Sequence, residues 1–157
     1  MDGQIMSREK EALRVLTILL RASGSVTNML KKDMLTYGMN PTEFAVMEVL
    51  FNLGKQPIQI IGKKVLLASS SITYVIDQLE KKGMVDREQC EDDRRVTFVS
   101  LSAEGQELMG EIFPQHSSVI KQLFEELSDE ELHKLGESLK AVGYKAIDIY
   151  DTIEDEA

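Results

Sequence analysis

Residues 69–83, SSSITYVIDQLEKKG, have hydrophobic positions spaced as on an amphipathic helix. Ile72, Val75, Ile76 and Leu79 stand at i, i+3, i+4 and i+7, so they form one apolar stripe. The remaining positions are polar and leave the opposite face of the helix free. We therefore expect a helix that starts near the first of the three serines and buries only one side.

Two short β-prone runs follow this helix, roughly 84–88 and 96–101, and a charged turn joins them. A helix followed directly by a small hairpin with arginines at its tip is typical of a winged helix. A shorter helix is predicted before it, from about Pro57 to Leu66. The few residues between the two helices match the spacing of a helix-turn-helix.

Helical patterns also precede the predicted helix-turn-helix. A long helix is predicted over about 7–35, and its apolar stripe is wider than one contact needs, with another subunit as a candidate second partner. After it, Asn40, Pro41 and Glu43 match the N-cap, first helical residue and capping-box partner of a helix that ends near Leu53.

Two more helices are predicted after the hairpin. Ser102 would cap a long helix over about 103–126, and Ser128 with Glu131 would form a second capping box. In the last helix, apolar positions alternate three and four apart over three heptads. This seam could be an intrachain core, but long and broadly apolar terminal helices favour association of two copies. The seam consists of Leu132, Leu135, Leu139, Val142, Ala146, Ile149 and Ile153.

The predicted fold class is therefore mainly α with a small β-hairpin wing. We expect a winged helix-turn-helix domain over residues 37–102, suited to DNA binding. Residues 1–36 and 103–157 are predicted to supply N- and C-terminal dimerisation helices.

The polar face of the 69–83 helix has short hydrogen-bonding side chains, an aromatic ring and a cation, which suit base edges and phosphates in a major groove. These side chains could instead pack on the helix surface or form a solvated helix end, and the hairpin tip could be an ordinary charged turn. However, arginines at a hairpin tip beside such a helix are placed for the minor groove and its phosphates. The residues predicted to contact double-stranded DNA are Ser70, Ser71, Thr73, Tyr74, Gln78, Lys81, Lys82, Arg87, Arg94 and Arg95.

The formal net charge of -9 becomes compatible with DNA binding once it is divided along the chain. Residues 1–54 carry six basic and six acidic side chains (net 0), residues 55–102 eight and seven (+1), and residues 103–157 four and fourteen (-10). Local potential decides nucleic-acid binding, so the helix-and-hairpin segment is not excluded from DNA.

Other function classes find little support. No apolar run approaches the roughly 18 residues of a membrane span, and the N-terminus lacks a signal-peptide pattern, so we expect a cytoplasmic protein without a membrane partner. No nucleophile motif, phosphate loop or HExxH sequence is present, so neither an enzyme nor a cofactor is expected. His116 and His133 are far apart in sequence, whereas zinc requires clustered ligands, so no metal site is expected.

Taken together, SITYVIDQLEKKGMVDR, DDRR and LSAEG resemble the MarR family of bacterial transcription regulators over nearly the whole chain. The stretch GKKVLLASSSITYVIDQLEKKG looks most like the branch that responds to quinones and related phenolic electrophiles. The resemblance implies an obligate homodimer that binds a pseudopalindromic operator, as a repressor, and is released by a small lipophilic or phenolic effector. It also implies that Asp93 orients an arginine. One departure is Tyr74, where many relatives have arginine.

The resemblance further implies an effector pocket between the dimerisation region and the DNA-reading lobe. Five soft or aromatic side chains bracket that junction and would suit a planar apolar ligand, although filling the core is an equally good role for most of them. They are Tyr37, Met39, Phe44, Met47 and Phe51.

Two alternatives stay open. The winged helix could serve only protein-protein assembly, without DNA. Alternatively, the single cysteine, Cys90, could make the protein a redox-sensing regulator, which requires an exposed and stabilised thiolate. Its acidic neighbours disfavour a thiolate, and the arginines nearby oppose that effect.

Overall fold

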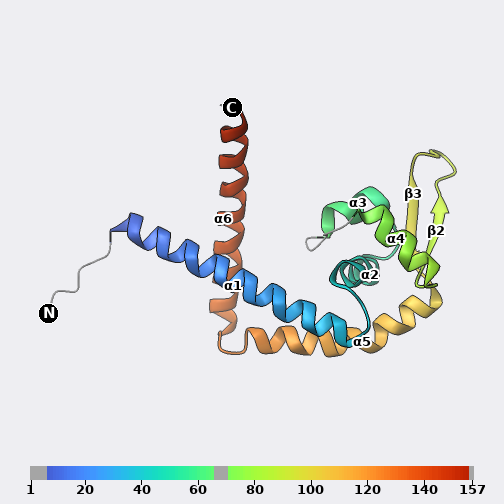
Figure 1. Ribbon diagram of the computed structural model, residues 1–157, viewed down its shortest axis with the longest axis horizontal. Coiled ribbons are helices and arrows are strands. Elements are labelled where there is room, and N and C mark those ends of the chain that lie inside the picture. Colours follow the sequence, from blue (N-terminus) through green and yellow to red (C-terminus); the bar gives the residue numbers. More distant parts are fainter. Residues whose placement is uncertain (1–6, 66–70, 156–157) are drawn as a thin grey trace. The chain divides into compact units, whose positions relative to one another are not determined.

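The protein is described by a computed structural model that covers residues 7–65 and 71–155 (Figure 1). The chain divides into two compact units, residues 1–116 and 117–157. The helices and strands are α1 (Arg8–Thr36), α2 (Pro41–Leu53), β1 (Gln56–Pro57), α3 (Ile58–Lys64), α4 (Ile72–Lys81), β2 (Val85–Gln89), β3 (Thr97–Leu101), α5 (Ala103–Leu123) and α6 (Asp129–Asp155).

The fold class predicted from the sequence is confirmed: the described residues are mostly helical, with one small antiparallel sheet ordered β1-β3-β2. The predicted hairpin is β2 and β3, paired in the register Val85↔Leu101 to Gln89↔Thr97. Strand β1, directly before α3, was not predicted. It is only two residues long, too short for an alternating pattern, and it exists because its backbone pairs with Val99 and its neighbour in β3.

The core of the first unit is built around α2, α4 and the sheet. The predicted stripe of α4 is confirmed, because Val75, Ile76 and Leu79 are buried and Ile72 packs against the core. Helix α2 is almost wholly internal. The largest fully buried side chains are Phe44, Met47, Leu50, Ile61, Ile76, Leu79, Met109, Val46, Val85 and Val99.

The predicted helix caps are also confirmed. Asn40 Oδ1 accepts a hydrogen bond from Glu43 N at 2.9 Å, and Asn40 N donates to Glu43 Oε2 at 3.3 Å, with proline at the first helical position. Ser102 Oγ accepts from the backbone N–H of Gly105 at 3.0 Å. The Ser128 box is present as well, since its Oγ accepts from Glu131 N at 3.3 Å.

The start of α4 differs from the prediction. The helix begins at Ile72 with Ser71 as N-cap, rather than near Ser69. Serine is a favoured N-cap, and three successive serines give the pattern no basis for choosing among them. Residues 66–70 lie outside the described part of the chain, and Ser70 with them.

A tight junction joins the end of α4 to the start of α5. Gly83, with a φ of 74°, ends α4, and its carbonyl accepts a hydrogen bond from Ser102 Oγ at 2.6 Å. Ser102 N donates to the Met84 carbonyl at 3.0 Å. Gly105, one turn into α5, is buried directly against that carbonyl. These contacts fix the first turn of α5 against the residues that connect α4 to β2.

In the second unit, α6 carries the predicted heptad seam. Leu139, Val142, Ile149 and Ile153 are exposed within a single chain, with Val142 exposing 52% of its surface. The seam is therefore not an intrachain core at these positions. Across residues 7–65 and 71–155, no helix combines the length and apolar character needed to cross a membrane.

Candidate nucleic-acid interface

Helix α4 presents the polar face that the sequence predicted. Ser71, Thr73 and Lys81 are exposed, Tyr74 exposes 58% of its surface, and Gln78 is half-buried. The apolar stripe on the opposite side of α4 packs into the core, and this packing fixes how the helix is rotated about its own axis. A polar face held in this way is suited to contact another molecule without rearranging.

The exposed face of α4 borders the N-terminal end of α2. Tyr74, Val75 and Gln78 line a small groove there together with residues 40–43. Glu43 contributes a buried carboxylate to this wall and completes the capping box of α2. The predicted base-contacting residue Gln78 therefore borders this groove at the start of α2.

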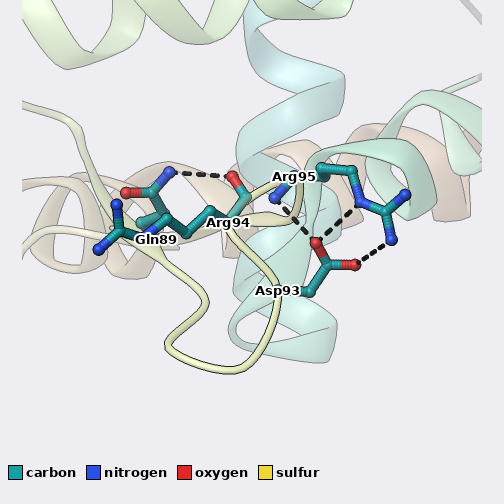
Figure 2. Close-up of polar contacts among 4 residues, drawn as sticks. All are labelled: Gln89, Asp93, Arg94 and Arg95. Carbon is teal, nitrogen blue, oxygen red and sulfur yellow. Dashed lines mark hydrogen bonds and ion pairs between the residues drawn. The ribbon is translucent and has the colours of Figure 1, made fainter.

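The turn between β2 and β3 holds Arg95 in a defined orientation (Figure 2). Asp93 Oδ1 accepts hydrogen bonds from Arg95 N and Nε, both at 3.0 Å, and Asp93 Oδ2 accepts from Arg95 Nη2 at 3.1 Å. The guanidinium of Arg95 lowers the pKa of the Asp93 carboxyl, and the carboxylate raises the pKa of Arg95. The Arg95 side chain remains 91% exposed. This geometry agrees with the orienting role expected for Asp93.

Arg94 is held differently. Its backbone carbonyl accepts a hydrogen bond from Gln89 Nε2 at 2.9 Å, and its side chain is exposed (Figure 2). Arg94 thus stabilises the turn through its backbone carbonyl, whereas Arg95 does so through both its backbone N–H and its guanidinium. The guanidinium groups of Arg94 and Arg95 are therefore exposed on a short turn that several hydrogen bonds stabilise.

Besides Arg95, two of the predicted DNA-contacting cations have carboxylate partners on α2 or α4. Lys82 Nζ lies 2.6 Å from the buried Glu43 Oε1, which links the end of α4 to the start of α2. Arg87 forms ion pairs with Asp77 and Glu80 of α4. No feature of the sequence pattern distinguished these two cations from those at the hairpin tip.

The five predicted pocket residues lie in or against the core of the first unit. Met39, Phe44 and Met47 are buried, while Tyr37 and Phe51 are partly buried beside them. The Tyr37 and Phe44 rings stack, with centroids 6.2 Å apart. In this state the three buried side chains fill the core, and the predicted pocket stays a prediction.

A polar network beside these residues was not predicted. Tyr37 Oη donates to Asp33 Oδ1 at 3.0 Å, and Asp33 Oδ2 lies 2.6 Å from His116 Nδ1, which is buried against Phe44. Burial, and to a lesser extent Asp33, raises the pKa of the Tyr37 hydroxyl. The only sequence signal was the i, i+4 spacing of Asp33 and Tyr37, because His116 is distant in the chain.

Cys90 follows β2 and is partly exposed, and its backbone N–H donates to the Val96 carbonyl at 2.9 Å. Its place is in the hairpin, within the first unit. The redox-sensing role of Cys90 stays a prediction.

Known proteins share both the sequence and the fold. The family model described as the MarR family matches residues 39–97. The HTH-type transcriptional regulator MhqR of Bacillus subtilis (strain 168) is 44% identical over 137 residues, which cover 87% of this chain and 94% of MhqR. The HTH-type regulator YkoM of the same organism is 39% identical over 134 residues, covering 85% of this chain and 87% of YkoM.

Solved structures agree on the fold. The MarR family regulator AbsC from Streptomyces coelicolor superposes with a TM-score of 0.76 at 24% identity, over 92% of this chain and 98% of AbsC. Sco3205 from the same organism, a MarR family regulator solved in complex with DNA, gives a TM-score of 0.69 at 24% identity, over 81% of this chain and 84% of its own. The family and the matched relatives are regulators rather than enzymes. The chain belongs to the MarR family of transcriptional regulators.

Proposed function

We propose that this regulator binds a pseudopalindromic operator as a homodimer, represses transcription, and is released by a small lipophilic effector of the phenol or quinone class. The observation that carries the DNA-binding part is the pairing of two features in one compact unit. One is the packed helix α4 with its exposed polar face, and the other is the hairpin arginine held by Asp93. In Figure 1, α4 lies beside the β2–β3 hairpin.

The proposed DNA contacts fall into two chemical groups, those to base edges and those to phosphates and the minor groove. Thr73 and Gln78 can donate to and accept from base edges, and Tyr74 offers an aromatic surface beside them. Lys81, Arg94 and Arg95 suit phosphates and the minor groove, where sequence information is low. Ser70 and Ser71 precede the helix and are proposed to bond to the DNA backbone. This division predicts different consequences for the two groups of side chains.

The homodimer is supported by apolar surface that a single chain leaves open. The seam of α6 is exposed, and so are Leu13, Val15, Leu16, Ile18 and Leu20 on the N-terminal half of α1. Long helices that each expose a row of apolar side chains mark association sites on a protein of this size. We assign residues 1–36 and 103–157 to dimerisation and residues 37–102 to DNA binding.

The effector part rests on the resemblance to the quinone- and phenol-responsive branch and on the five residues named for the pocket. Because three of them are buried, a ligand must displace side chains to enter. The methionines among them are flexible enough to adapt. An effector acts only to the extent that it binds the DNA-incompetent state more tightly, and reducing occupancy from 99% to 1% takes about 5.5 kcal/mol of such preference.

The base-contacting role of α4 is tested by Gln78→Ala and Thr73→Ala. Each variant should weaken binding to the true operator by about 1 to 3 kcal/mol and change binding to random duplex little, because base contacts discriminate sequences. Fluorescence anisotropy with the promoter fragment adjoining the protein's own gene, and with a scrambled duplex, measures both quantities.

Arg95→Ala is the matched comparison, and it should weaken binding to both duplexes because its contacts are to backbone and groove. Equal losses on operator and scrambled DNA for Gln78→Ala would remove the base-contacting role. Wild-type binding without a negative salt dependence would favour an assembly module instead.

The effector mechanism is tested by comparing Cys90→Ser with wild type in an operator-release titration, once with a phenol and once with a quinone. We expect both proteins to release DNA at the same effector concentration, since the proposed pocket binds without covalent chemistry. A serine variant that responds to neither compound would make the thiol the sensor and exclude the pocket.

A further inference from the structure

We infer that Arg87 is a positioning residue that fixes the recognition helix α4 to the wing, and that it does not contact DNA. This inference rests on the proposed function, because it assumes that α4 reads the operator. It deepens that function by separating one cation of the hairpin from those at its tip. The inference starts from the partners of the guanidinium.

Two hydrogen-bond acceptors and one further carboxylate, all on α4, surround the guanidinium of Arg87. Its Nη2 group forms an ion pair with the Asp77 carboxylate and donates to the Thr73 carbonyl at 3.4 Å. Its Nε lies 3.6 Å from Glu80 Oε2. Residues 73, 77 and 80 are spaced i, i+4 and i+7, so they follow one side of the helix over about two turns. A single side chain from β2 thus bridges a long stretch of α4.

The chemistry of this contact suits arginine. A planar guanidinium can donate in several directions at once, whereas a lysine ammonium is a compact point charge. The Arg87 side chain is only 26% exposed, and its Nε is buried without a hydrogen-bond acceptor among the described residues. The group is therefore desolvated on one side and held by charge on the other.

The same surroundings disfavour a DNA phosphate. A phosphate approaching Arg87 would also approach Asp77 and Glu80, whose two negative charges exceed the single positive charge of the guanidinium. Like charges repel, so the cluster as a whole offers no attraction to DNA. Arg95 presents the opposite case, since it is 91% exposed and has one carboxylate partner.

The position of Arg87 explains what the contact does. It joins β2, which carries the wing, to the turn of α4 that contains Thr73, one of the proposed base-contacting residues. Fixing the helix relative to the wing keeps the two sets of DNA contacts in register, and recognition groups held by such support bind with less loss of entropy. Loss of Arg87 should therefore reduce discrimination between sequences.

The test measures affinity for the operator fragment and for a scrambled duplex across a range of salt concentrations. A phosphate contact contributes about 0.9 to the slope of log K against log salt. For Arg87→Ala we expect operator affinity to fall about tenfold, the size of one lost charged hydrogen bond, with the slope unchanged and scrambled DNA little affected. Lys81→Ala, which removes an exposed cation of the same helix in each subunit, should lower the slope by about 1.8 for the homodimer and weaken both duplexes.

A second variant distinguishes the positioning role of Arg87 from a purely electrostatic effect by the direction in which DNA affinity changes. Asp77→Asn with Glu80→Gln removes two negative charges near DNA, which by electrostatics alone should strengthen binding to every duplex. If Arg87 acts through these carboxylates, operator affinity should instead fall while scrambled DNA binding rises or stays equal. Circular dichroism at the assay temperature confirms that each variant is folded.

Two results would overturn the inference: a slope reduced by about 1.8 in Arg87→Ala, or a uniform gain in affinity for the carboxamide variant. Failure of the proposed function gives a different result, because wild-type protein would then not prefer the operator over scrambled DNA.

Discussion

Replacing Gly105 with alanine is expected to lower the free energy of unfolding of the regulator by about 3 kcal/mol, at the upper end for an overpacked site. A Cβ atom at this position would lie 2.1 Å from the Met84 carbonyl oxygen and 3.0 Å from its carbonyl carbon. Both neighbours belong to backbone, so no rotamer change relieves the overlap. The Met84 carbonyl also accepts the Ser102 hydrogen bond, so moving it away costs that contact.

Urea unfolding followed by circular dichroism, at one protein concentration, measures the change. Gly110→Ala is the matched control, because the same helix carries this glycine and nothing lies within 4 Å of an added Cβ. Its expected effect is a gain of about 0.5 to 1 kcal/mol from helix propensity. Equal losses for the two variants would show that the Met84 contact is not what requires glycine at position 105.

This glycine belongs to the LSAEG motif, and it shows why local signals predicted so much of the fold. Ser102 was expected to cap a helix from its residue type alone, and the cap is present. The capping boxes and the apolar stripe of α4 were predictable for the same reason, since the residues that determine them are neighbours in the chain. The close contact between Gly105 and Met84 was not, because nothing in the pattern brings α5 onto the end of α4.

Features that depend on partners distant in the chain could not be predicted from the sequence. Strand β1 exists only through its pairing with β3, and His116 meets Asp33 across most of the first unit. A run of hydrophobic or charged residues contains no information about which distant group completes it. Pairings of this kind follow from the packed fold rather than from local propensity.

The candidate site shows the same limit. Residue type and spacing were sufficient to place Thr73 and Tyr74 on an exposed helix face. They could not separate Arg95, which is oriented toward solvent by Asp93, from Arg87, which is held by two carboxylates of α4. Charge alone made both cations candidates for DNA, and only the geometry of their partners distinguishes them.

The double substitution Leu139→Asp with Ile149→Asp is expected to convert the regulator to monomer and to reduce operator affinity at least a hundredfold. Both side chains belong to the exposed seam of α6, so the change places charges where two copies are proposed to pack. Two half-sites about one helical turn apart need two linked DNA-binding units, and a monomer loses the gain from their linkage. Sedimentation velocity gives the oligomeric state, and gel shift on the operator fragment gives the affinity.

The control for this variant is Ala141→Asp with Tyr144→Asp, which adds the same two charges at exposed positions on the side of α6 away from the seam. It should remain dimeric and bind the operator nearly as wild type does. Because Leu139 and Ile149 are exposed in a single chain, their replacement removes no intrachain core, and monomers should keep wild-type helix content by circular dichroism. A seam variant that stays dimeric and binds normally would exclude α6 from the dimer interface. A seam variant that loses its helices would instead show that α6 depends on the second copy to remain folded.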